Sequence, residues 1–466
     1  MIAATTERSV GKGPDFRDAF EGGKHEGMAQ ANLPFGEVRQ LQRTLYAAAK
    51  RAPQRKFHAL YDRIFRKDVL REAWERVKAN GGSAGADGVS IRQVEDTIGV
   101  SEFLAEIETA LRDKRYHPQP VRRVYIPKPG RPGDKRALGI PAVRDRVVEA
   151  ATRIVIEPIF EADFLPASYG FRPKRSAHQA LDAIREAQRR GFLVALDLDL
   201  RKYFDTVNHD LLLSLVAKRI SDRRVLKLIR QWLKAGVMED GTVTEPTEGT
   251  PQGGVISPLL ANIYLHELDR RWTEQHPTPA VEIRYADDVL FLCGYKEQAE
   301  QTLDWVRRVL ADLRLTLNED KTRIADLRQE EGFDFLGFHH RLATPRHGDR
   351  RKRRLARWPA AKAMQRIRQA IRDRLRLAQL LGLDLEHTVA ELNMVLRGWA
   401  AYFRHGESRR HFQHVEWYTH QALALWDSHR GPSHGRRWRA HSLAWFLALG
   451  VYRPTNALRA ARARPA

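Results

Sequence analysis

The stretch that decides the fold is residues 281–292, which read VEIRYADDVLFL. Apolar and β-branched residues on both sides predict two short strands, with Ala286, Asp287 and Asp288 at the tight turn between them. Two adjacent carboxylates repel each other, so such a pair on a rigid hairpin usually holds hard cations through oxygen ligands. An ordinary solvated turn is the alternative, because Asp is common in turns. A metal site therefore needs a third carboxylate from elsewhere in the chain.

A third carboxylate is found upstream, in residues 192–205, which read FLVALDLDLRKYFD. The strict alternation from Val194 to Leu200 predicts a strand that carries Asp197 and Asp199 on one face. A carboxylate at the end of this strand, beside the hairpin, would complete a site of three Asp side chains. Such a site can hold two divalent metals about 4 Å apart, one to activate an attacking 3′-hydroxyl and one to stabilise the pyrophosphate leaving group. The spacing does not choose between Asp197 and Asp199.

Residues 249–262, GTPQGGVISPLLAN, lie between these two segments. A turn rich in Gly and Pro runs into an apolar helix, with Ser257 as the expected N-cap and Pro258 in the first turn. Glycines at the entry allow a ligand or a neighbouring backbone to approach closely. An ordinary start of a helix after a loop is the alternative.

In this order, residues 199–205, 250–254 and 285–288 resemble the reverse transcriptases encoded by bacterial group II introns. The other blocks that resemble this family are LYDRIFR at 60–66, GADGV at 85–89, YIPK at 125–128, RALGIP at 136–141, SYGFRP at 168–173, SAH at 176–178, LNEDKT at 317–322, FLGF at 335–338 and RGWAAYF at 397–403. The resemblance covers roughly residues 40–430.

The resemblance implies an α+β fold, a right-hand polymerase whose fingers and palm contain an antiparallel sheet, followed by an α-helical thumb, or maturase, domain. The expected domains are a flexible N-terminus at 1–36, an N-terminal extension at 37–57, fingers and palm at 58–340, the thumb at 341–430 and a basic C-terminal segment at 431–466. One interpretation of the last segment is a short remnant of a DNA-binding domain. No HNH endonuclease domain is expected, because that domain carries paired cysteines and this chain has one Cys.

Helical periodicity in the thumb predicts helices at about 360–381, 386–403 and 411–428, and residues 346–357 are expected to form a basic linker. Glu37 to Lys50 also has a helical pattern.

The resemblance assigns roles to individual residues. The implied metal ligands are Asp199, Leu200, Asp287 and Asp288. Asp199 is preferred to Asp197 because the family has an aromatic residue five positions after the metal ligand, here Phe204. Lys321 would be the proton donor to the departing pyrophosphate. The implied cofactor is Mg²⁺, as two ions, for which Mn²⁺ is a substitute.

The implied substrates are dNTPs on an RNA template. Phe204 would lie under the sugar and reject a 2′-hydroxyl by steric clash, and Gln252 and Leu200 would line the dNTP pocket. Lys128 and Arg136 would neutralise the triphosphate, since Arg binds phosphate bidentately and Lys acts as a point charge. In so basic a chain, a solvated residue or a contact to an RNA backbone is the alternative for any single Lys or Arg.

The chain has a net charge of +22 and a pI near 10.2, which indicates a polyanionic partner. Residues 341–466 contain 26 Lys and Arg against 8 Asp and Glu, so a net charge of +18 lies beyond the catalytic segments. The residues expected to bind nucleic acid are Arg350, Arg351, Lys352, Arg353 and Arg354. The run is expected to lack acidic partners, and a solvated run is the alternative to one bound to RNA. The partners implied are group II intron RNA and an RNA template with a DNA primer or target DNA.

A single cysteine, Cys293, permits no intrachain disulfide and no cysteine-based zinc site, which is consistent with a reducing cytosol. No apolar stretch reaches the roughly 18–20 residues of a membrane span, and the first residues do not resemble a signal peptide. The expected location is therefore the bacterial cytosol, with association with the nucleoid when the protein is on target DNA.

Three functions are compatible with these patterns. The leading one is an RNA-directed DNA polymerase that binds its parent intron RNA, assists splicing and copies the RNA into DNA during retromobility. The second is a domesticated relative, such as a defence or CRISPR-associated reverse transcriptase. The third is a splicing or RNA-binding factor without polymerase activity, against which the intact Asp199, Asp287 and Asp288 argue. Flanking intron RNA domains or neighbouring defence genes would separate the first two.

Overall fold

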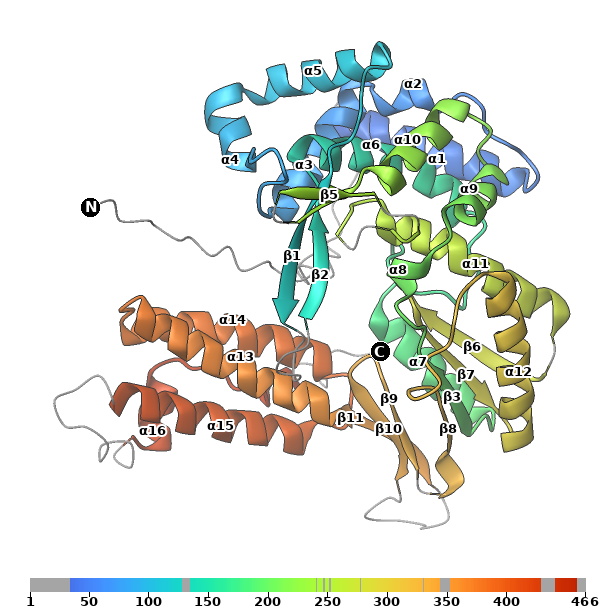
Figure 1. Cartoon of the computed structure of the whole chain (residues 1–466). Coiled ribbons are helices and arrows are strands. Elements are labelled where there is room, and N and C mark those ends of the chain that lie inside the picture. Colours follow the sequence, from blue (N-terminus) through green and yellow to red (C-terminus); the bar gives the residue numbers. More distant parts are fainter. Residues whose placement is uncertain are drawn as a thin grey trace.

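The computed structural model describes residues 34–127, 135–239, 241–245, 248–250, 253–276, 278–329, 331–343, 353–428 and 441–458. These residues form a mixed α+β protein with three parts, the fingers, the palm and a helical thumb (Figure 1). The predicted fold class is thus confirmed. The predictions for residues 1–33 and for residues 429–440 and 459–466 fall outside the described residues.

The fingers, at the top of Figure 1, combine helices with a small sheet. Their helices are α1 (Pro34–Arg51), α2 (Tyr61–Ile64), α3 (Lys67–Asn80), α4 (Ile91–Gln93), a π-helical turn (Val94–Ile98), α5 (Val100–Arg112) and α6 (Val143–Glu161). The sheet has the strand order β2-β1-β4-β5 and consists of β1 (Val121–Pro127), β2 (Lys135–Ile140), β4 (Val237–Glu239) and β5 (Thr242–Thr244). The apolar stripe of α1, which includes Leu41 and Leu45, is buried in the same core as α6.

The palm contains a four-stranded antiparallel sheet in the order β6-β7-β3-β8. Its strands are β3 (Val194–Leu198), β6 (Ala280–Tyr285), β7 (Asp288–Cys293) and β8 (Arg323–Asp326). The helices of this part are α7 (Ala177–Arg189), α8 (Tyr203–Thr206), α9 (His209–Ala217), α10 (Arg223–Lys234), α11 (Ser257–Gln275) and α12 (Lys296–Asp312), and a 3₁₀ turn (Leu327–Gln329) follows β8.

Helices cover both faces of the palm sheet, which the alternation in β3 makes necessary. Leu196 and Leu198 point into the core that α11 and α12 share, whereas Ala195 packs in a second core with residues of α7. Asp197 and Asp199 belong to the same alternation as Ala195, as predicted. The sheet is therefore a rigid platform with its polar positions at one end of β3.

The thumb follows a three-stranded sheet of order β11-β10-β9, made of β9 (Gly332–Phe335), β10 (Phe338–Ala343) and β11 (Arg354–Pro359). Its helices are α13 (Ala361–Leu380), α14 (Leu385–Phe403), α15 (Arg409–Ser428) and α16 (Leu443–Ala448). The first three lie where helical periodicity predicts them. The expected basic linker is wrong at its end, because Arg354 begins β11 and pairs with Ala343 of β10.

The proposed boundary between residues 340 and 341 falls inside β10, so one small sheet joins the palm segment to the thumb. Residues of the palm and of α14 and α15 also share a core, among them Leu292, Phe403 and Phe412. Within the described residues, no helix is long and apolar enough to cross a membrane.

Candidate active site

The strands of the palm bring the three predicted carboxylates to one edge of the sheet. In the β6–β7 hairpin, Tyr285 pairs with Asp288, so Ala286 and Asp287 form the turn. Ala286 has a positive φ of 59°, a conformation that suits a tight turn. The last register pair between β3 and β7 joins Leu198 to Val289. Asp199 follows directly and therefore lies beside Asp288.

Negative charge is concentrated at this edge. Although Asp288 is exposed, protein surrounds its carboxyl closely enough to cost hydration, and this cost together with the charges of Asp287 and Asp199 raises its pKa to about 7. Burial is also the main cause that raises the pKa of Asp197 to about 7, followed by the charges of Asp288, Asp199 and Asp334. Crowded carboxylates of this kind favour the binding of a cation.

Lys321, the predicted proton donor, lies against Asp199. Its Nζ is 3.1 Å from Asp199 Oδ2, and both side chains are exposed to solvent. The loop that carries Lys321 is fixed to the end of β3, because the N–H of Asn318 donates to the carbonyl of Asp199 over 2.8 Å. The ammonium group neutralises part of the charge that the carboxylates place at this edge.

The residues at this edge carry the types of ligand atom that divalent cations prefer. Carboxylate oxygens are the ligands that Mg²⁺ and Mn²⁺ prefer, and Leu200, with its apolar side chain, could contribute only its carbonyl oxygen. Among the described residues, no group of three or more His, Cys, Asp or Glu side chains is arranged closely enough to hold a metal ion. Desolvation is the first cause of the raised pKa of Asp288 and the charges of Asp287 and Asp199 add to it, so a divalent cation at this edge would relieve the repulsion among these carboxylates.

The predicted sugar gate, Phe204, lies in α8, five residues after Asp199 in the chain. The ring is half-buried and contacts Tyr203 edge to face, with 5.2 Å between the ring centroids. Its carbonyl accepts a hydrogen bond of 2.7 Å from the N–H of Thr250, so the loop before α11 is held against α8. A Cβ at Gly249 would stand 2.9 Å from the carbonyl oxygen of Asp205, which explains the small residue there.

Three predicted substrate residues are described incompletely or not at all. Lys128 and Gln252 lie outside the described residues. Arg136 is described by its backbone alone, which pairs with Ile126 in the β1–β2 hairpin. This hairpin projects from the fingers toward the thumb (Figure 1).

The start of α11 differs from the prediction. Ser257 is not the N-cap: Ile256 occupies that position, and its side chain makes no cap hydrogen bond. The N–H of Ile256 instead donates to Glu149 Oε2 of α6 over 3.2 Å. Glu149 is buried, and burial raises its pKa to about 7. A carboxylate between the apolar residues Val147, Val148, Ala150 and Ala151 was the signal that could have identified this residue.

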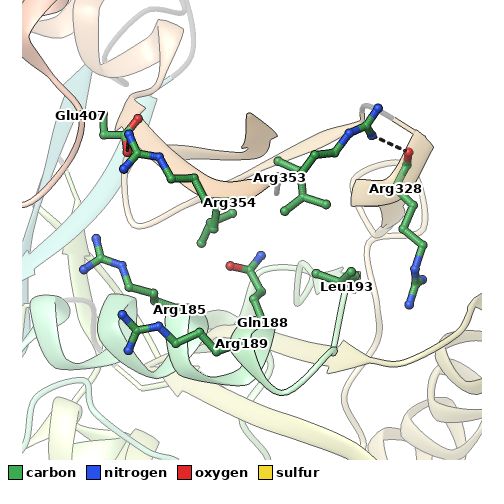
Figure 2. Close-up of a pocket in the computed structure, with 10 residues that line it drawn as sticks. Arg185, Gln188, Arg189, Leu193, Arg328, Arg353, Arg354 and Glu407 are labelled. Atoms are coloured by element: carbon green, nitrogen blue, oxygen red, sulfur yellow. Dashed lines mark hydrogen bonds and ion pairs between the residues drawn. The ribbon is translucent and has the colours of Figure 1, made fainter. Parts of the chain in front are cut away.

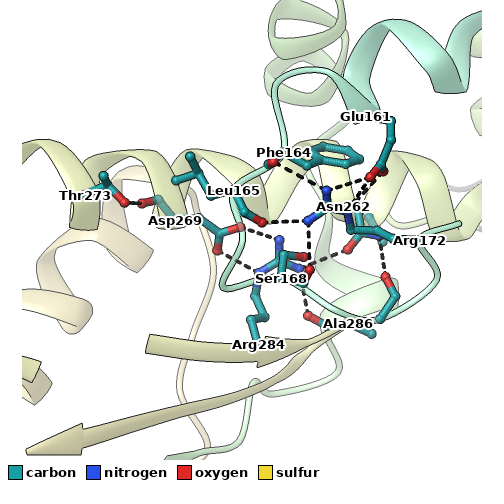
Figure 3. Close-up of polar contacts among 12 residues, drawn as sticks. Glu161, Phe164, Leu165, Ser168, Arg172, Asn262, Asp269, Thr273, Arg284 and Ala286 are labelled. Carbon is teal, nitrogen blue, oxygen red and sulfur yellow. Dashed lines mark hydrogen bonds and ion pairs between the residues drawn. The ribbon is translucent and has the colours of Figure 1, made fainter. Parts of the chain in front are cut away.

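Beneath the turn at Ala286 and Asp287 lies a buried polar network that the sequence interpretation missed (Figure 3). Arg284 of β6 and Asp269 of α11 form an ion pair in which both side chains are fully buried, with 2.7 Å between Nε and Oδ1. Nη1 of Arg284 also donates to the side-chain oxygen of Asn262 over 3.0 Å and to the carbonyl of Ala286 over 3.1 Å. A single guanidinium thus ties the turn to α11.

The segment 168–173 is held against the same hairpin. The amide of Asn262 donates to the carbonyl of Gly170 over 2.8 Å, and the N–H of Tyr169 donates to the carbonyl of Arg284 over 2.8 Å. Arg172 supports this loop from behind by donating to the carbonyls of Leu165 and Ser168. An arginine beside Ile283 in the strand 281–285 was the signal for this network, because a buried charge needs a partner.

Of the five basic residues expected to bind nucleic acid, Arg350, Arg351 and Lys352 lie outside the described residues. Arg353 and Arg354 are exposed. The expectation that the run lacks acidic partners is wrong for Arg354, which lies 3.0 Å from Glu407.

The chain is similar to known proteins over both of its main parts. Residues 126–340 match the family "Reverse transcriptase (RNA-dependent DNA polymerase)", and residues 364–445 match "Group II intron, maturase-specific domain". The protein YkfC of Escherichia coli K12 is 38% identical over an alignment of 348 residues, and the match covers 66% of this chain and 89% of YkfC.

Intron-encoded proteins are also among the relatives. The group II intron-encoded protein LtrA of Lactococcus lactis is 40% identical over 216 residues, which are 46% of this chain and 35% of LtrA. An uncharacterized 91 kDa protein in the cob intron of Schizosaccharomyces pombe is 36% identical over 215 residues, or 45% of this chain and 25% of that protein. These matches favour an intron-encoded protein over a domesticated relative or a splicing factor without polymerase activity.

The structure and the comparisons agree. The palm has carboxylates at one edge of its sheet and is followed by a helical thumb, and the chain matches both the reverse transcriptase family and the maturase-specific domain. The chain belongs to the group II intron-encoded reverse transcriptases with a maturase domain, and it is an RNA-directed DNA polymerase.

Proposed function

We propose that Asp199, Asp287 and Asp288, with the carbonyl of Leu200, bind two Mg²⁺ ions, which Mn²⁺ can replace. Bound there, the metals would activate the primer 3′-hydroxyl and stabilise the leaving pyrophosphate. The observation that carries this proposal is the position of Asp199 beside Asp288 at the edge of the palm sheet, where the pKa of Asp288 is raised to about 7. Asp197 lies two residues farther inside β3 and is proposed to support the charge of the site rather than to bind metal.

The chain's own residues would bind and orient the substrates. Lys321 is proposed to hold a proton at Nζ and give it to the departing pyrophosphate, and its position 3.1 Å from Asp199 supports this role. Phe204 is proposed to lie under the sugar of the incoming dNTP. Lys128 and Arg136 are proposed to bind the triphosphate and Gln252 to line the dNTP pocket.

We also propose that the protein binds its parent intron RNA, assists its splicing and copies it into DNA from a primer or target DNA. The net charge of +18 in residues 341–466 supports binding of a polyanion, because each phosphate contact releases counterions. The domain limits proposed are 1–36, 37–57, 58–340, 341–430 and 431–466. The bacterial cytosol, with association with the nucleoid on target DNA, is the proposed location.

The test is extension of a DNA primer on an RNA template by variants with single carboxylate changes. Asp199→Asn, Asp287→Asn and Asp288→Asn should each lower the rate by orders of magnitude and leave RNA binding nearly intact, because each removes a metal ligand and no basic contact. Asp197→Asn is the matched control on the same strand face. Near-normal extension by Asp199→Asn would refute the assignment, and a large loss in Asp197→Asn alone would move the ligand by two residues.

A further inference from the structure

A cavity of about 730 Å³ lies between α7 and β11, at the far end of β3 from the catalytic carboxylates (Figure 2). Leu193, which lines it, directly precedes β3, whereas Asp199 directly follows that strand. Sites for small molecules usually have volumes of about 300–1,000 Å³. The cavity is therefore large enough for a ligand of nucleotide size and is separate from the site of polymerisation.

Arginines dominate the polar lining of this cavity. The five are Arg185, Arg189, Arg328, Arg353 and Arg354, all of them exposed except the half-buried Arg185. Among the described residues, the one carboxylate in the lining is Glu407, which is paired with Arg354. Positive charge thus exceeds negative charge at the mouth, and guanidinium groups suit the oxygens of a phosphate.

Neighbouring acids balance only part of this charge. Arg189 lies 3.5 Å from Glu186, and Arg328 lies 3.5 Å from Asp326. Arg185 makes no ion pair with a described residue, and it projects from α7 toward β11 (Figure 2). An anion that enters the cavity would therefore meet the guanidinium of Arg185, which forms an ion pair with no carboxylate in the described part of the chain.

The interior of the cavity is apolar apart from one amide. Leu193, Leu342 and Leu355 line it and are half-buried. Gln188 is only 7% exposed and points from α7 into the space below β11 (Figure 2). Neither its amide nitrogen nor its amide oxygen has a hydrogen-bond partner among the described residues. An unpaired buried amide is destabilising. A ligand with a hydrogen-bond donor and an acceptor side by side would give both the oxygen and the nitrogen of this amide a partner.

We propose that this cavity binds one nucleoside phosphate, with the phosphate among the arginines and the base between the leucines and Gln188. The edge of a nucleobase presents a donor and an acceptor side by side, which an amide can bind bidentately. A flat base with apolar faces also fits a cavity lined by leucines. The nucleotide is either free in solution or an unpaired nucleotide of bound RNA, and the second source rests on the proposed function in RNA binding.

The test measures binding of two fluorescent probes to the full chain, a nucleoside monophosphate and a short single-stranded RNA, in EDTA so that the polymerase site holds no metal. Gln188→Leu should weaken binding about tenfold, the equivalent of one lost bidentate contact, while the melting temperature stays equal or rises. The double variant Arg185→Ala with Arg189→Ala should weaken binding at least as much and reduce its salt dependence. Arg190→Ala, at the exposed end of the same helix and outside the cavity, is the matched control.

The two probes separate the two sources. If the cavity variants bind the monophosphate more weakly, the natural ligand of the cavity is a free nucleotide. If they bind only the RNA more weakly, the ligand is an unpaired nucleotide of RNA. Unchanged affinity of Gln188→Leu for both probes, or an equal loss in Arg190→Ala, would overturn the proposal. Failure of the unmodified chain to bind RNA, with monophosphate binding retained, would count against the proposed RNA function and leave the cavity assigned to a free nucleotide.

Discussion

Gly170 lies flat against the β6–β7 turn at Ala286: a Cβ built on Gly170 would stand 2.3 Å from the backbone nitrogen of Ala286 and 2.8 Å from the carbonyl carbon of Tyr285. Real Cβ atoms do not approach backbone so closely, and neither segment can yield as a flexible side chain would. The loop 168–173 and the β6–β7 hairpin are therefore in backbone-to-backbone contact. The position of Asp287 and Asp288 depends on this contact.

Gly170→Ala should accordingly displace the turn and reduce primer extension by about 100-fold or more, because a misplacement of about 1 Å can have that effect. Far-ultraviolet circular dichroism should show the helices unchanged. Gly398→Ala is the matched control: Gly398 is exposed within α14, and a Cβ there would meet nothing within 4 Å. The control should raise stability by about 0.5–1 kcal/mol and leave extension unchanged. Equal activity of the two variants would show that the contact does not position the turn.

Arg284→Lys should separate charge from geometry in the buried network. Lysine keeps the positive charge near Asp269 but cannot also reach Asn262 and the carbonyl of Ala286 as the planar guanidinium does. We expect a loss of about 2 kcal/mol in stability from the lost hydrogen bonds and at least a tenfold fall in kcat for extension. Urea denaturation and single-turnover kinetics measure the two effects.

Arg271→Lys is the control for this change, since Arg271 lies on the same helix, α11, and contacts Asp312 and Glu267 rather than the turn. A normal kcat in Arg284→Lys, together with the lower stability, would limit the network to a structural role.

Phe204→Ala tests the predicted sugar gate. The change should open space beside the 2′ position and raise incorporation of rNTP relative to dNTP, while the hydrogen bond from Thr250 to the main chain of residue 204 remains. Steady-state kinetics with matched dNTP and rNTP give the ratio. An unchanged ratio would place the ring in the core alone, as its contact with Tyr203 would allow.

The stability of the fingers should depend on pH through Glu149. Burial raises the pKa of this carboxyl to about 7, above its value in the unfolded chain, so the folded state binds more protons between about pH 4.5 and 7. The free energy of unfolding should therefore fall as the pH rises through this range, by about 3 kcal/mol.

Glu149→Gln keeps an oxygen for the N–H of Ile256 and cannot ionise, so the variant should be more stable than the parent at pH 8 and similar at pH 5. Part of the decrease in the free energy of unfolding with rising pH should remain in this variant, because burial also raises the pKa of Asp145, to about 6. Urea denaturation at the two pH values measures the difference. If both proteins lose stability equally from pH 5 to pH 8, Glu149 is ionised throughout this range and does not cause the pH dependence.

What the sequence predicted follows local periodicity. The alternation in β3, the hairpin at Asp287 and the three thumb helices depend on residues near one another in the chain, so the pattern suffices to locate them. The features that were missed depend on long-range pairing. Glu149 binds the start of α11 from 107 residues away, and pairing with β10 makes Arg354 part of a strand despite its basic neighbours.

Neutralising Arg350, Arg351, Lys352, Arg353 and Arg354 together should separate RNA binding from catalysis. Binding to structured RNA should weaken and its salt dependence should flatten, because each lost phosphate contact removes about one unit of counterion release. Turnover of a primer–template already bound should change much less, since none of these residues is proposed to touch the metals or the dNTP. Filter binding across a range of salt concentrations measures the affinity for RNA, and single-turnover extension measures the turnover of the bound primer–template.

Arg354 gives this experiment an internal control. Arg354 forms an ion pair with Glu407, so Glu407→Gln removes the carboxylate and leaves the guanidinium of Arg354 in place. If the run binds RNA, this variant should bind equally or more tightly, because one competing carboxylate is gone, while the fivefold variant binds more weakly. If the salt dependence of RNA binding is the same in all three proteins, the run is solvated. The surface that contacts RNA would then lie on the thumb helices, of which α13 carries Arg366, Arg368, Arg372, Arg374 and Arg376.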